Sequence, residues 1–318
     1  MGQTTTLIRT SIFAFLQHLH LFSSSPSLLA LPFAAATLLC QPLLSSSPLF
    51  PSLHHRLKSL FLAAGFPPSS DLFPVLNLKL TQTLLSFLFL LPFSLSFLLL
   101  SKASTIQTLF PHHNNKNNNF LSWISTLNAL VVTQFCNSLV ILSANATCFS
   151  LLIIFFDISD ILGVSSPKTL LLLSAIGAIA YSIVVANACI ICNLALIISG
   201  VENRGGFASI LKSCVLLKGR MGIALSLAVP INMGLAGIEA LFQYRIVRAY
   251  NRTMDIDLSM ALEAMLVAYM YAMLVVLDTV VGSVFLKSCR ADYDIDRIDE
   301  RSDQGSVFGK EKAFESLL

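Results

Sequence analysis

The chain has 318 residues, of which 55% are hydrophobic and only 12% are charged, and its formal net charge is +3. Soluble globular domains carry about 25% charged residues, so this chain has too little polar surface to face water on all sides. No basic stripe is interleaved with aromatic residues, which argues against a nucleic-acid-binding surface. The composition therefore predicts a protein that lies within the lipid bilayer and binds no nucleic acid.

The apolar residues are gathered in long runs. A helix rises about 1.5 Å per residue, so roughly 20 apolar residues cross a hydrocarbon core about 30 Å thick. Six segments meet this requirement, at about residues 26–44, 79–100, 124–156, 169–198, 221–242 and 260–286. The sequence predicts an all-α fold, a polytopic membrane helical bundle of about six transmembrane helices that form one domain over 26–286.

Residues 1–25, which precede the first span, are apolar but interrupted by Arg9, Gln17 and two histidines. These interruptions predict a helix that lies in the membrane interface. A Ser-rich start without acidic residues is also typical of a transit peptide, and the run Ala34–Ala36 resembles a signal cleavage site. We expect an interfacial segment, with a cleaved targeting peptide as the alternative.

The third apolar segment is longer than one bilayer crossing requires. A continuous helix from Leu121 to Phe156 would exceed about 50 Å in length. The segment is either one long helix that emerges from the membrane or two shorter helices with a break near Ser143–Thr147. We expect the single long helix.

The distribution of Lys and Arg between the short loops predicts the orientation in the membrane. The loop at 200–220 contains four basic residues, and the segment after the sixth span begins with Lys287 and Arg290. With six spans, both segments share one side with the N-terminus, and we assign that side to the cytosol. The loop after the fifth span is also basic, against this rule, but its sequon Asn251–Arg252–Thr253 suits a lumenal face. Residues 287–318 mix acidic and basic side chains and are predicted to form a disordered cytosolic tail.

Three enzyme signatures are absent from the sequence. The chain contains no G-x-S-x-G elbow, no H-E-x-x-H pair and no Walker A loop. Cys189 and Cys192 form a C-x-x-C pair, but a closed metal site needs further ligands, and the same span offers only Asn187 and Asn193. We interpret these cysteines as small residues at a helix contact and expect a non-enzymatic protein without metal or cofactor.

Polar residues inside the predicted spans are better indicators of function, since each must pair with another group or face water. They are Asn137, Asn145, Asn187, Asn193, Asn232, Glu239 and Asp278. Asp278 lies well inside the sixth span, where a charged carboxylate is costly. A structural role predicts a hydrogen bond to Tyr271 or to an Asn of the fourth span, whereas a functional role predicts a path for a solute or a proton. We favour the structural role, because no second acid or base is predicted at the same depth.

Residues 202–220 form the most organised polar stretch. Six apolar residues recur at helical spacing, and three bases lie near the opposite face or the end. The apolar residues are Phe207, Ile210, Leu211, Cys214, Val215 and Leu217, and the bases are Lys212, Lys218 and Arg220. This pattern predicts a short helix on the cytosolic surface whose bases meet anionic headgroups. Beyond the sixth span, Cys289 stands beside basic residues, a setting that favours palmitoylation.

The run ENRGGFASILKSCVLLKGR resembles a motif of an uncharacterised family of plant multi-pass transmembrane proteins. The motif reads E-x-x-x-G…S-x-x-L-x-K-G-R and precedes a membrane span. The matching residues are Glu202, Gly206, Ser213 and the ending Leu217–Lys218–Gly219–Arg220. Ala208 departs from the alanine spacing of that family, and the N-terminal half of the chain is much less similar. The resemblance implies the same membrane fold and supplies no catalytic residue.

These patterns predict an integral protein of the endomembrane system or the plasma membrane. The expected role is a non-enzymatic component that binds an anionic lipid or a protein partner at the cytosolic face. A small-solute transporter or channel using polar residues of spans four to six is the alternative, and a wet cavity joining Asp278 to Asn187 or Asn193 would favour it. The candidate functional polar residues are Asp278, Asn187, Asn193, Glu202, Lys218 and Arg220.

Overall fold

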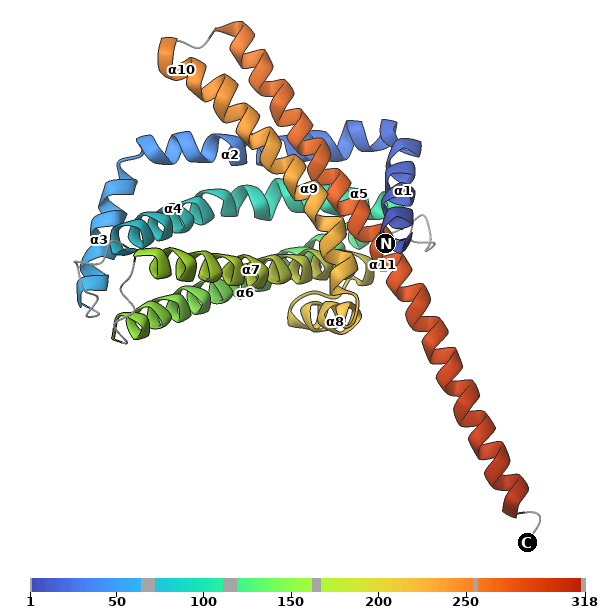
Figure 1. The fold of residues 1–318 in the computed structure, drawn as a ribbon. Helices are drawn as coiled ribbons and strands as arrows, with labels where there is room; N and C mark the ends of the chain where they lie inside the picture. Colours follow the sequence, from blue (N-terminus) through green and yellow to red (C-terminus); the bar gives the residue numbers. More distant parts are fainter. Residues whose placement is uncertain (1, 64–71, 111–118, 162–166, 254–256, 316–318) are drawn as a thin grey trace.

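The computed structural model describes residues 2–63, 72–110, 119–161, 167–253 and 257–315, and these residues are helical almost throughout (Figure 1). The elements in chain order are α1 (Gly2–Gln17), α2 (Leu19–Ser46), α3 (Leu49–Ala63), α4 (Leu72–Phe93), the π-helical turn η1 (Ser94–Leu98), α5 (Leu99–Leu109), α6 (Asn119–Ile161), α7 (Pro167–Glu202), α8 (Phe207–Leu217), α9 (Met221–Phe242), the π-helical turn η2 (Gln243–Val247), α10 (Arg248–Thr253) and α11 (Leu258–Glu315). No strand occurs in the described ranges.

Six helical segments within the described residues are long and apolar enough to cross a membrane. They are Leu19–Cys40, Asn77–Leu109, Trp123–Cys148, Ala175–Glu202, Met221–Arg252 and Leu258–Ala291. This confirms the predicted all-α fold with six membrane-competent helices, and the protein is an integral, multi-pass membrane protein. The second segment continues nine residues past its expected end at residue 100, because α5 extends the helix beyond the apolar run.

The long third segment is a single helix. α6 continues without a break through Ser143 and Thr147. The alternative of two shorter helices with a break at these residues was therefore wrong. Both side-chain hydroxyls donate hydrogen bonds to carbonyls one turn back in the same helix, Ser143 to Val140 at 2.9 Å and Thr147 to Ser143 at 3.0 Å. Such local bonds satisfy a hydroxyl without breaking the helix. α7 then returns along α6, and the two form a hairpin (Figure 1).

Pro26 inside the first span is accommodated by side chains around it. Pro26 removes a backbone donor from α2, and the Ser27 hydroxyl donates instead to the Phe22 carbonyl at 2.6 Å. Two neighbouring helices also donate to this part of α2, Ser101 to the Pro26 carbonyl at 2.8 Å and Tyr269 to the Ser23 carbonyl at 3.0 Å. A transmembrane helix can contain proline when such partners are close by.

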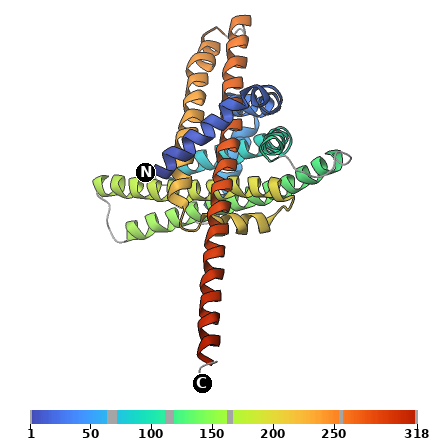
Figure 2. The ribbon, with the colours of Figure 1, turned by 90° about the vertical axis from the view of Figure 1, so that its right-hand side faces the viewer.

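α11 is the central helix of the bundle. It packs against α1, α2, α5, α7 and α9. α9 and α11 run side by side and cross the group formed by α2, α4, α5, α6 and α7 (Figures 1 and 2). One apolar cluster fills the space between α7, α9 and α11, and a second lies between α2, α9, η2 and α11.

Both ends of the chain are helical in the described residues, which the sequence predicted for the N-terminal end and not for the C-terminal end. The expected interfacial segment 1–25 is divided between α1 and the start of α2, and Leu7 and Ile8 of α1 pack on the apolar cluster beside α11. Residues 287–315, expected to be disordered, continue α11 as a helix that stands away from the bundle (Figure 2). No proline follows Leu258, so the sequence contains no strong helix-breaking residue where α11 leaves the bundle.

Three chain segments meet at one end of the bundle. The Lys287 ammonium group donates to the Leu109 carbonyl at 3.2 Å and lies 4.6 Å from the centre of the Phe110 ring. The Arg290 guanidinium group donates to Glu202 at the end of α7. The ends of the second, fourth and sixth spans therefore lie together, as expected when six spans alternate in direction.

This arrangement predicts that a tag after Leu318 is digested by protease added to sealed microsomes, because the tail and the 200–220 loop share the side assigned to the cytosol. A tag at the N-terminus should be digested in the same preparation. Protection of the C-terminal tag, with digestion restored by detergent, would contradict the assigned orientation.

Candidate functional site

The intramembrane site is a cluster of three polar side chains from three helices. Lys102 of α5 donates from its ammonium group to the side-chain oxygen of Asn193 of α7, at 2.5 Å. The Asn193 amide nitrogen donates in turn to Asp278 Oδ2 of α11, at 2.8 Å. Lys102 is only 5% exposed. The amide of Asn193 thus bridges a buried ammonium group and a carboxylate, which compensate each other's charge inside the bundle.

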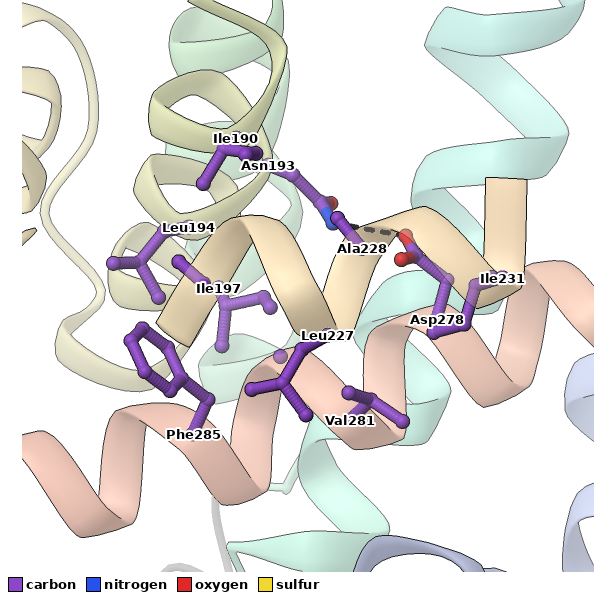
Figure 3. A pocket seen from close by; sticks show the side chains of 12 residues that line it. Ile190, Asn193, Leu194, Ile197, Leu227, Ala228, Ile231, Asp278, Val281 and Phe285 are labelled. Atoms are coloured by element: carbon purple, nitrogen blue, oxygen red, sulfur yellow. Dashed lines mark hydrogen bonds between the residues drawn. The ribbon is translucent and has the colours of Figure 1, made fainter. Parts of the chain in front are cut away.

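A small cavity of about 50 Å³ lies beside Asn193 and Asp278, between α7, α9 and α11 (Figure 3). Apart from these two residues its lining is apolar, including Leu194, Leu227 and Phe285. A space of this size holds a few water molecules at most. Asn187, the other candidate of the fourth span, does not line it.

The Lys102–Asn193–Asp278 cluster agrees in part with the prediction for Asp278. The hydrogen bond to an Asn of the fourth span is present, whereas the Tyr271 hydroxyl donates to Glu239 at 3.1 Å instead. The expectation that no second acid or base lies at the depth of Asp278 was wrong, because Lys102 lies there. Lys102 was missed because it follows the apolar run that ended the predicted second span. The sequence feature that could have indicated Lys102 as a site residue is its position, since it is a single Lys two residues beyond that run with no second base close by.

The turn between α7 and α8 is packed tightly against α6. Gly206 adopts a positive φ of 86°, which favours glycine, and its N–H donates to the Thr133 hydroxyl at 2.9 Å. A Cβ on Gly205 would lie 2.4 Å from the Ala129 carbonyl oxygen. The Asn203 side chain accepts a hydrogen bond from Thr126 of α6. These contacts explain why polar and small residues are gathered at the start of the 202–220 stretch.

Glu202 connects three elements at the same end of the bundle. It is the last residue of α7 and forms ion pairs with Lys212 of α8, at 2.6 Å, and with Arg290 of α11. The sequence indicated Glu202 as a candidate, and the structure places it between these two bases. Glu202 thus links α8 and the emerging part of α11 to the end of α7.

α8 is the short helix that the sequence predicts, but its apolar residues are divided between two faces. Ile210 and Leu217 are buried against the bundle, together with Ser209 and Ser213. Three other large apolar residues point outward, with exposed fractions of 58% for Phe207, 67% for Leu211 and 67% for Val215, and Leu216 is half-buried. The outer face of α8 is thus apolar, which is unusual for a helix in contact with water.

The other predicted residues near α8 differ in accessibility. Lys218, which follows α8, is exposed, and Arg220 is half-buried directly before α9. Cys289 is only 2% exposed and packs in the apolar cluster with Leu217 and Leu286. Palmitoylation of Cys289 stays a prediction, and it would require this contact to open.

The described residues include no group of three or more His, Cys, Asp or Glu side chains placed to hold a metal ion.

Over residues 4–309 the chain matches the model of a family described as Domain of unknown function (DUF8558). The protein belongs to the DUF8558 family. The matched region contains both the Lys102–Asn193–Asp278 cluster and α8. No curated protein and no solved structure shows significant similarity to the chain. The likeness of Glu202–Arg220 to the plant motif stays a prediction.

Proposed function

We propose that this DUF8558 protein is a non-enzymatic membrane component that binds lipids or a protein partner through its cytosolic face, at α8. The outward apolar face of α8 is the observation that carries this proposal. Its exposed residues stand beside Lys212 and Lys218, so the surface combines apolar area with positive charge. Apolar patches bordered by polar residues are typical of sites that contact a membrane or another protein.

The proposal is tested by placing a photo-crosslinking amino acid at residue 211 and irradiating source membranes. Leu211 is 67% exposed on the outer face of α8, and the neighbouring Ile210 is 8% exposed, so position 210 is a matched control on the same helix. We expect lipid or protein adducts at position 211 and mainly internal crosslinks at position 210. Equal, low adduct formation at both positions would contradict the proposal.

A small-solute transporter is the second candidate, and the Lys102–Asn193–Asp278 cluster favours it. Ionisable residues inside a membrane often mark paths for ions or protons. The direct hydrogen bonds and the small cavity are equally compatible with a structural role. A transport role predicts that Asp278→Asn retains detectable folded protein but abolishes a pH-dependent flux into proteoliposomes. Absence of any flux in the unsubstituted protein would remove this candidate.

A further inference from the structure

α8 differs from a surface helix of a soluble protein, because its two hydroxyl groups are buried while three of its large apolar residues face outward. Both hydroxyl groups are buried: Ser213 donates to the Ile191 carbonyl of α7 at 3.1 Å, and Ser209 donates to the Arg204 carbonyl in the turn before α8 at 2.6 Å. Phe207, Leu211 and Val215 are spaced four residues apart and face outward. They therefore form one continuous stripe along the helix.

The bases around this stripe are not equivalent. Lys212 forms an ion pair with Glu202 at 2.6 Å. Arg204 and Lys218 are exposed, and neither side chain has a hydrogen bond or ion pair with the residues that the structure describes. They flank α8, one before its first turn and one after its last, and an 11-residue helix is about 16 Å long. Two cations thus stand at the ends of an apolar stripe.

We propose that α8 lies at the boundary between headgroups and acyl chains of the cytosolic leaflet and binds anionic phospholipids. Phe207, Leu211 and Val215 enter the acyl region, while Arg204 and Lys218 contact lipid phosphate groups. The occupant is the protein's own bilayer, because α8 is joined directly to α9, whose spanning segment begins at Met221. An apolar stripe bordered by bases is the pattern of helices that lie in the membrane interface. This inference rests on the proposed function and names the partner as a lipid.

The charges determine which lipid is preferred. The stripe contacts any acyl chain, so it contributes little discrimination between headgroups. Each base near an anionic membrane surface favours binding by about fivefold at moderate ionic strength. Arg204 and Lys218 should therefore provide most of the preference for anionic headgroups, and Lys212 should contribute less because its ammonium group is already paired with Glu202.

The test uses the full-length protein reconstituted in vesicles of equal parts phosphatidylserine and phosphatidylcholine. The protein is then extracted in mild detergent and the retained lipids are quantified. We expect phosphatidylserine to be enriched on the unsubstituted protein and this enrichment to fall severalfold in R204Q/K218Q. The single variants K218Q and K212Q form the matched comparison, since each removes one lysine charge in or directly beside α8, and K212Q should change the enrichment less than K218Q. Higher salt should weaken the enrichment in the unsubstituted protein.

The inference is overturned if the unsubstituted protein retains both lipids equally, or if R204Q/K218Q retains as much phosphatidylserine as the unsubstituted protein. Both replaced side chains are exposed, and an unchanged melting temperature in detergent will show that the variant is folded. Photoadducts at position 211 that contain only protein would also overturn the lipid inference, while leaving the proposed function standing.

Discussion

Replacing Asp278 by Leu is expected to destabilise the protein by about 3–5 kcal/mol, because it leaves the buried ammonium group of Lys102 without a countercharge. Lys102→Met should have a similar effect, since it leaves the Asp278 carboxylate bonded only to the Asn193 amide. The double variant K102M/D278L removes both charges and should regain much of the lost stability. Melting temperature in detergent and the amount of folded protein in membranes measure these effects.

The presence of Lys102 also changes the expectation for a milder substitution. Without a neighbouring base, Asp278→Asn should be nearly silent, because an amide has the same shape. Because Asp278 belongs to the Lys102–Asn193–Asp278 cluster, Asp278→Asn removes the charge that compensates Lys102. The melting temperature should therefore fall, but by less than in Asp278→Leu. Asn187→Leu is the matched control within the fourth span, because Asn187 lies outside the cluster and should tolerate the change. Additive effects of K102M and D278L would show that the two charges are not coupled.

Gly205→Ala is expected to cost about 1–3 kcal/mol, because the new methyl group would lie 2.4 Å from the Ala129 carbonyl oxygen. The obstructing atoms belong to the backbone of α6, so no side-chain rotation can relieve the clash. The turn must move away from α6, which would also strain the hydrogen bond from Gly206 to Thr133. The melting temperature should fall, and proteolysis of the 200–220 loop in detergent should become faster.

Gly222→Ala is the control for this prediction. Gly222 lies in the first turn of α9, and a Cβ there would meet no atom within 4 Å. Alanine also favours a helix more than glycine does, so this variant should be neutral or slightly stabilised. Equal melting temperatures for Gly205→Ala and Gly222→Ala would show that the turn is not tightly packed against α6.

The membrane fold was predictable because hydrophobic length alone determines whether a helix can cross a bilayer. Segment ends were less predictable, since polar residues near a span can be satisfied by other helices. Lys102 illustrates this: in the sequence it ends an apolar run, whereas in the bundle it reaches Asn193 of α7. Charge pairing between distant helices leaves no periodic signal in a single sequence.

The rotation of α8 about its own axis also could not be predicted from the sequence. Helical spacing predicted α8 at the right place, but it did not indicate which apolar residues face the bundle. Ile210 is buried and Leu211 is exposed because the turn at Gly205 and Gly206 sets the rotation of α8 against α6 and α7. A rotation fixed by a tertiary contact cannot be read from hydrophobic periodicity.

The proposed position of α8 at the cytosolic surface is tested most directly by labelling introduced cysteines in sealed microsomes with a membrane-impermeant maleimide. The exposed native residues Cys189 and Cys214 are first replaced by Ser, and Lys218→Cys and Asn251→Cys are then introduced separately. These positions lie at opposite ends of the fifth span. We predict that Lys218→Cys is labelled in intact microsomes and that Asn251→Cys is labelled only after detergent is added. Labelling of Asn251→Cys in intact microsomes, with protection of Lys218→Cys, would contradict the cytosolic position of α8.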